Sequence, residues 1–222
     1  MSTLLLPAPR AILFDWDDTL VDNWGAIAHA LNVAFAAFGM PRLAVDEVKR
    51  RATRSMRDSF PEIFGADWTH ARDLFLASFA EHHVAELAVK PGALALLETI
   101  RCAGIPAAVV SNKNGPFLRE EAGHLDWTGR FVALVGAGDA AADKPDPAAV
   151  AMALSGAEIA AGEDVWLVGD STVDMACAAA TGCTGIRIDW SRQGGEAPEG
   201  QKRAVTSLEE VRTLVSALRG SI

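Results

Sequence analysis

The chain of 222 residues contains no tyrosine and only three cysteines, Cys102, Cys177 and Cys183. Their number is odd and no two form a CxxC pair, so neither a disulfide framework nor a zinc site is indicated. This cysteine usage fits a reducing cytoplasm, and the short apolar start MSTLLLPAPR lacks the basic region of a signal peptide. No apolar run approaches the length that spans a bilayer, so we expect no membrane partner.

Positive charge is also scarce, because 20 lysines and arginines stand against 29 aspartates and glutamates, giving a formal net charge of −9. An acidic surface repels the phosphates of nucleic acids, which argues against a nucleic-acid partner. The remaining composition, half hydrophobic and 22% charged, is that of an ordinary globular protein. The length allows one large domain, or a core with a small second domain.

Short, nearly all-apolar runs alternate with alanine-rich helical patterns along most of the chain. Each run contains β-branched or aromatic residues and ends at a polar or glycine turn, which is typical of buried parallel strands. The alternation predicts an α/β fold with a doubly wound, Rossmann-like parallel sheet. We expect strands at Ala11–Phe14, Pro106–Val110, Phe131–Val135, Val165–Val168 and Thr184–Ile188, and helices near 93–103, 116–123, 147–155 and 173–181.

The stretch 22–88 interrupts this alternation, because no convincing strand is found in it. Apolar residues recur there at helical spacing, as at Ile27, Leu31 and Phe35. Segments around Gly39 and Gly65 mark breaks between helices. We therefore predict a helical-bundle insert over residues 22–88, carried by a core domain made of residues 1–21 and 89–222.

Punctuating residues predict the boundaries of the later elements. Pro91 is expected as the first residue of the helix that follows the insert, and Gly104 as its stop. The segment Ser191–Gln201 is rich in Gly, Pro and Glu and is predicted to be a loop. The last helix is expected at Ser207–Leu218.

Acidic residues follow two of the predicted strands directly. Asp15, Asp17 and Asp18 follow the first strand, and Asp170 and Asp174 follow the run VWLV. Ligands of open α/β sheets bind outside the carboxyl ends of the strands, and carboxylates at this density are costly unless a cation neutralises them. Aspartates in turns also cap helices, which is the alternative for Asp18 and Asp170.

Two weaker signals lie between these acidic clusters. Ser111, Asn112 and Lys113 follow the strand PAAVV, where a hydroxyl and backbone N–H groups suit a phosphate oxygen. Lys144 precedes two prolines that set the first turn of a helix. Taken alone, a Ser-Asn pair is also a common turn and a lysine is usually just solvated.

The four clusters together, in this order, resemble the haloacid dehalogenase superfamily of phosphotransferases. Its motifs DxDx[TV], a strand-end Ser or Thr, a Lys and GDxxxD correspond here to Asp15–Thr19, Ser111, Lys144 and Gly169–Asp174. The insert between the first and second motifs resembles the helical cap of the phosphoglycolate phosphatase group. The chain departs from that group at position 16, commonly Phe, and at position 18, often Gly, where it has Trp16 and Asp18.

The resemblance implies a phosphatase and a role for each matching residue. Asp15 would be the nucleophile that forms an aspartyl-phosphate, and Asp17 the general acid and then the general base. A Mg²⁺ cofactor would be held by Asp15, Asp170 and the backbone carbonyl of Asp17, with Asp174 supporting that site. Lys144 would offset the negative charge around the phosphate. Contacts to the substrate are expected from Ser111, Thr19, Asn112 and Lys113.

Arginines crowd one segment of the insert, VKRRATRSMRDSF, in an otherwise acidic protein. If the segment is one helix, Arg50, Arg54 and Arg57 share a face. Arg54 or Arg57 would then read a carboxylate on the substrate, because a planar guanidinium pairs well with it. The alternative is a solvated face, which is what most arginine runs form.

The expected substrate is a small phosphorylated metabolite similar to phosphoglycolate. A phosphomutase of the same superfamily has the same four motifs and remains an alternative, as does a binding protein on a retired phosphatase fold. A dehalogenase needs no acid at position 17, so Asp17 favours phosphate chemistry. The sequence leaves the oligomeric state open.

Overall fold

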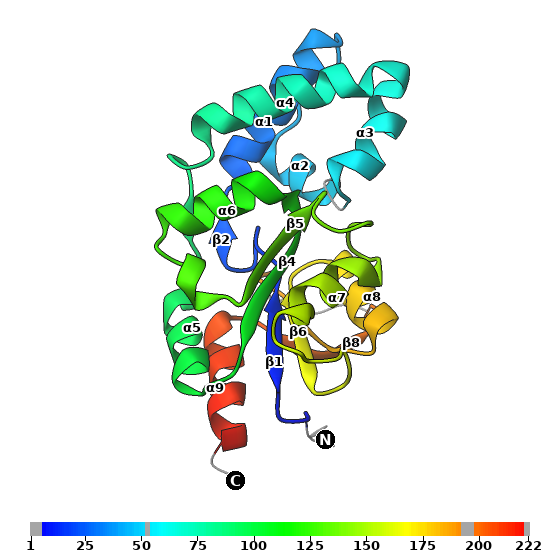
Figure 1. Cartoon of the computed structure of the whole chain (residues 1–222). Coiled ribbons are helices and arrows are strands. Elements are labelled where there is room, and N and C mark those ends of the chain that lie inside the picture. The colour runs from blue at the N-terminus through cyan, green and yellow to red at the C-terminus, as the bar shows by residue number, and fades with distance from the viewer. Residues whose placement is uncertain (1–5, 52–53, 192–197, 220–222) are drawn as a thin grey trace.

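The computed structural model describes residues 6–51, 54–191 and 198–219. Its main sheet is parallel, with the strand order β5-β4-β1-β6-β7-β8 (Figure 1). The chain runs from β1 to β4 on one side and later from β6 to β7 on the other, so the order reverses between β1 and β6. The strands are β1 Ala11–Phe14, β4 Ala107–Asn114, β5 Ala133–Ala137, β6 Val165–Gly169, β7 Thr184–Ile188 and β8 Gln201–Val205.

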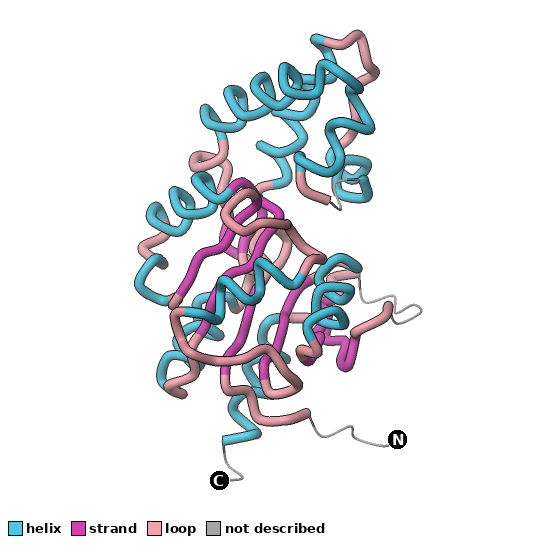
Figure 2. Tube along the Cα trace, turned by 45° about the vertical axis from the view of Figure 1, so that its right-hand side comes forward, coloured by secondary structure: helices cyan, strands magenta, loops and turns pink. Residues whose placement is uncertain are grey.

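Helices cover both faces of this sheet (Figure 2). Side chains of β1 alternate between the faces, because Ile12 and Phe14 join one hydrophobic cluster whereas Leu13 joins the other. The doubly wound α/β fold predicted from the sequence is therefore confirmed. The first cluster includes residues of α5 Ala93–Cys102, α6 Gly115–His124 and α9 Leu208–Arg219, and the second includes residues of α7 Pro147–Ser155 and α8 Thr172–Thr181; a short 3-10 helix lies at Thr128–Arg130.

A second group of helices lies beyond the carboxyl ends of the strands, at the top of Figure 1. These helices share their own hydrophobic cluster, and we call them the cap. Breaks between these helices fall at Gly39 and Gly65, as predicted, and both glycines have positive φ. The cap consists of α1 Trp24–Ala37, α2 Val45–Arg51, α3 Met56–Phe64, a 3-10 turn at Gly65–Asp67 and α4 Trp68–His82.

Two short strands were not predicted at the edges of the insert. β2 Val21–Asp22 pairs antiparallel with β3 Ala88–Val89, and so joins the two linkers that connect the cap to the sheet. Strands of two residues are too short to produce an alternating pattern in the sequence. No helix of the described residues is long and apolar enough to cross a membrane.

Several predicted boundaries are wrong, each for a local reason. β4 does not stop at Val110 but continues through Asn114, whose Cα pairs with Ala137. Pro91 lies in a turn, because Gly92 adopts a left-handed conformation as the N-cap and α5 begins after it. Gln201 does not end a loop, as predicted, but begins β8. Only Val205 of that edge strand is buried, so the strand lacks an apolar run. Residues 192–197 of the expected loop lie outside the described residues.

The arginine-rich segment is not one helix. α2 ends at Arg51, and Ser55 has an extended conformation at the start of α3. Arg50, Arg54 and Arg57 therefore do not share a helical face, and the spacing argument for them is wrong.

Candidate active site

Three carboxylates meet where the strand order reverses. Asp15 follows β1, Asp170 follows β6, and Asp174 lies in the first turn of α8, with one oxygen of each within 4.8 Å of the others. Ser171 is the N-cap of α8, so the alternative role of Asp170 as that cap is not observed. The Asp174 carboxylate accepts hydrogen bonds from the backbone N–H of Ser171 (3.0 Å) and from its hydroxyl (2.6 Å).

Lys144 supplies positive charge to this acid cluster. Its ammonium lies 2.8 Å from Asp15 and 2.6 Å from Asp174, and its side chain is only 3% exposed. Burial alone would lower the pKa of Lys144, but the two carboxylates outweigh it and raise that pKa above its ordinary value. Lys144 is therefore a permanent cation at this site.

The acid cluster retains excess negative charge despite this lysine. Burial raises the pKa of Asp15 to about 6, although Lys144 opposes the shift. Burial also raises the pKa of Asp170, and the charges of Asp174 and Asp15 add to this effect. These groups carry only hard oxygen donors, the type that Mg²⁺ selects, so the residues present fit such an ion. Its binding would relieve the repulsion among them.

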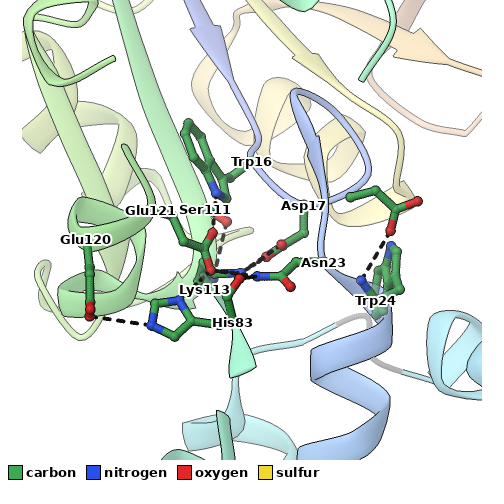
Figure 3. A network of polar contacts seen from close by, with 10 residues as sticks. Trp16, Asp17, Asn23, Trp24, His83, Ser111, Lys113, Glu120 and Glu121 are labelled. Carbon is green, nitrogen blue, oxygen red and sulfur yellow. Dashed lines mark hydrogen bonds and ion pairs between the residues drawn. The ribbon is translucent and has the colours of Figure 1, made fainter. Parts of the chain in front are cut away.

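Asp17 points to a different cation (Figure 3). Its two carboxylate oxygens lie 2.8 and 3.0 Å from the ammonium of Lys113, whose side chain is 4% exposed. Burial raises the pKa of Asp17, while Lys113 acts in the opposite direction. Asp15 and Asp17 are thus held by two different lysines.

The other predicted phosphate contacts occupy distinct positions. Ser111 is buried at 5% exposure, and its hydroxyl oxygen accepts a hydrogen bond from the backbone N–H of Lys113 (3.2 Å). Asn112 donates to the backbone carbonyl of Lys144 (3.0 Å), which joins the second motif to the third. Thr19 is fully buried and donates to Asp170 (3.2 Å), so it orients a candidate metal ligand and does not line the cavity.

A cavity of about 650 Å³ opens over these groups, between the sheet and the cap. The size is ordinary for a small-molecule site. Its sheet side carries the polar groups and its cap side is mostly apolar and aromatic. The lining includes Asp15, Asp17, Ser111, Asn112, Lys113, Lys144 and Asp170 below, and Trp24, Phe35, Phe60, Phe75, Phe79, Lys49, Arg51 and Arg54 from the cap.

The two arginines predicted to read the substrate differ in position. Arg54 lines the cavity and pairs with Glu62, also of the cap. Arg57 is not among the lining residues; its Nε donates to Asp143 (3.0 Å), directly before Lys144. Asp143 is in turn fixed by the backbone N–H of Gly138 (3.0 Å). Arg57 therefore joins the cap to the loop that carries Lys144.

The sequence model of the haloacid dehalogenase-like hydrolase family matches residues 12–188, most of the chain and all four motifs. The chain belongs to this family. It is 32% identical to a plasmid-encoded phosphoglycolate phosphatase of Cupriavidus necator, over 99% of this chain and 98% of that one. It is 28% identical to a phosphoglycolate phosphatase of Pseudomonas syringae pv. tomato, covering 93% of this chain and 79% of the relative.

Solved structures agree with this assignment. A haloacid dehalogenase superfamily hydrolase from Ehrlichia chaffeensis is 25% identical, with a TM-score of 0.67, and the match covers 96% of this chain and 98% of that one. The prediction of a hydrolase of this superfamily is confirmed, and the named phosphatases among its relatives support the class of phosphoric monoester hydrolases.

The two departures from the family pattern each have a partner in the structure. The indole N–H of Trp16 donates to Glu121 (2.6 Å), a bond that the more common Phe could not make. Asp18 has φ +59°, a conformation that favours glycine, and its carboxylate pairs with Lys90 and Lys49. It lies in the turn before β2, so the helix-capping alternative for Asp18 is not observed.

Sequence reasoning did not identify Glu121, which is fully buried beside the site. One signal was available: Glu121 comes three residues after Leu118 and one before Ala122, on the buried face of α6. A charged residue on an apolar helical face needs a partner, and that partner here is Lys113 (3.1 Å).

The raised pKa of Asp170 predicts a pH-dependent stability. In a chelator, the folded protein keeps a proton on Asp170 that the unfolded chain releases as pH rises past about 3.8. The free energy of unfolding should therefore fall as pH rises, until the folded carboxyl ionises. Asp170→Asn cannot ionise, so at pH 7.5 it should be more stable than the wild type, with the difference vanishing near pH 4.

Urea denaturation at both pH values in EDTA measures this difference. Added Mg²⁺ should stabilise the wild type and leave Asp170→Asn nearly unchanged. A variant less stable than the wild type at pH 7.5 in EDTA would contradict the proposed charge repulsion.

Proposed function

We propose that this family member is a Mg²⁺-dependent phosphatase that hydrolyses a small phosphorylated metabolite through an aspartyl-phosphate on Asp15. The observation that carries the proposal is the position of Asp15. Its carboxylate lies on the cavity, beside Lys144 and within reach of Asp170 and Asp174. Phosphoryl transfer depends mainly on positioning and charge neutralisation, and this arrangement supplies both.

In the first step, an oxygen of Asp15 attacks phosphorus and the bond to the leaving alcohol breaks. Asp17 gives a proton to the leaving oxygen. In the second step, Asp17 takes a proton from water, which then releases phosphate from Asp15. Ser111 and the ammonium of Lys144 contact the phosphoryl oxygens during both steps. Asn112 holds the loop that carries Lys144, and Lys113 holds the acid Asp17.

Mg²⁺ would be held by the carboxylates of Asp15 and Asp170 and by the backbone carbonyl of Asp17. Asp174 would support this site without binding the ion directly, because its two carboxylate oxygens already accept hydrogen bonds from Lys144 and Ser171. The bound ion would supply charge neutralisation for a phosphate entering an acidic site. We also propose the cytoplasm as the compartment, as the cysteine usage suggests.

The names of the relatives suggest phosphoglycolate as the first substrate to test. Glycolate carries a carboxylate, and the cap offers Arg54 on the cavity wall to pair with it. Arg57, the other arginine that the sequence predicts for this role, is engaged by Asp143 and would act by holding the cap against the loop of Lys144. A cap held over the cavity in this way would exclude water before the attack of Asp15.

Asp15→Asn should reduce phosphate release by roughly a thousandfold or more, because an amide cannot act as the nucleophile. Phosphate release from phosphoglycolate and from an aryl phosphate, with and without Mg²⁺, measures this loss. The variant should fold, since one charge leaves a crowded acid cluster. Near-normal release by Asp15→Asn would end the nucleophile assignment, and a sugar isomer without free phosphate would favour a phosphomutase.

Arg54→Ala should reduce kcat/KM for phosphoglycolate by roughly 10- to 100-fold, the value of a hydrogen bond to a charged group. It should leave kcat/KM nearly unaffected for an aryl phosphate whose aryl group carries no charge. Arg57→Ala, the matched control, should slow both substrates to the same degree, because it loosens the cap and contacts no substrate. An Arg54→Ala variant whose kcat/KM for phosphoglycolate matches that of the wild type would show that Arg54 does not contact the substrate.

A further inference from the structure

Glu121 is a fully buried carboxylate that accepts hydrogen bonds from several segments of the chain (Figure 3). Its donors are the indole N–H of Trp16 (2.6 Å), the amide of Asn23 (2.8 Å), the imidazole Nδ1 of His83 (3.0 Å) and the ammonium of Lys113 (3.1 Å). Burying an ionised carboxylate is costly unless it is paired and fully hydrogen-bonded, as this one is. An apolar residue would fill the same space on α6 without this requirement.

The origin of the donors suggests what the carboxylate is for. Trp16 lies between Asp15 and Asp17, and Lys113 holds Asp17. Asn23 and His83 lie in the two linkers that carry the cap: Asn23 is the N-cap residue before α1, and His83 is the C-cap residue after α4. Asn23 also donates to the backbone carbonyl of His83 (2.9 Å), which joins the linkers to each other.

We propose that Glu121 is a positioning residue for the general acid Asp17. It orients Asp17 through Lys113, and its hydrogen bonds with Asn23 and His83 link that orientation to the position of the cap on its two linkers. This inference rests on the proposed phosphatase function. Glu121 is fully buried and does not line the cavity, so it would act through Lys113 and not on the substrate itself. Its removal would leave the ammonium of Lys113 with one carboxylate partner in place of two, free to turn and take Asp17 out of line.

The dependence of the rate on the leaving group reports whether Asp17 is correctly oriented. When the phosphorus–oxygen bond breaks, its electron pair moves to the leaving oxygen, which takes the proton of Asp17. An alkyl alkoxide is a poor leaving group and needs that proton. A nitrophenolate is a good leaving group and does not, so its departure depends little on how Asp17 is placed.

The test compares kcat/KM for an alkyl phosphate ester and for 4-nitrophenyl phosphate in Glu121→Gln. This constant reports the steps up to phosphorylation of Asp15, in which Asp17 acts as the acid. We expect a loss of roughly 10- to 100-fold on the alkyl ester and less than about threefold on the nitrophenyl ester. Equal losses on both esters, or none on either, would overturn the inference.

Two further variants keep the test decisive. Glu120→Gln is the matched control, because Glu120 is the neighbouring residue, 61% exposed, and only approaches His83 at 3.4 Å; both esters should be unaffected. Trp16→Phe removes one donor and should show the same selective loss at smaller size, which decides the matter if Glu121→Gln does not fold. A wild type that hydrolyses neither ester would instead refute the proposed function itself.

Discussion

The contact of Lys144 with Asp15 and Asp174 is the constraint on which the rest of the site depends. Three carboxylates lie within 4.8 Å of one another at the edge of a buried sheet, and ionising all of them without a cation would be unfavourable. One permanently charged lysine offsets only part of this charge. The proposed Mg²⁺ would neutralise the remainder, and so allow a phosphate to enter a protein that is acidic as a whole.

A second lysine, Lys113, gives Asp17 a different ion-pair partner from that of Asp15. Lys144 holds Asp15 toward the acid cluster, whereas Lys113 holds Asp17 on the side of α6 and the cap linkers. The proposed nucleophile and the proposed acid, only two residues apart, therefore lie in different electrostatic surroundings. Such a division is what allows two carboxylates of one motif to perform different chemistry. The cap is tied to both sides, through Arg57 and Asp143 on one and through Asn23 and His83 on the other.

The sequence alone predicted five of the six strands of the main sheet, and the polar residues that follow them. Asp15, Ser111 and Asp170 follow apolar runs, and parallel strands bring such positions to one edge. The sequence could not show which cation each aspartate would take, because the contact between Lys113 and Asp17 depends on β4 continuing past Val110. Nor could it show β8, since an exposed edge strand needs no apolar pattern, or the break that separates the arginines of the cap.

The most direct test of the central claim is to look for the phosphoryl group on Asp15 during turnover. The enzyme is mixed with excess substrate and Mg²⁺, quenched in acid within milliseconds and reduced with borohydride, which converts an aspartyl-phosphate to homoserine. Peptide mass spectrometry should then find homoserine at position 15, dependent on substrate and absent in Asp15→Asn. Rapid phosphate release with Asp15 unmodified, or with homoserine at another aspartate, would contradict the account.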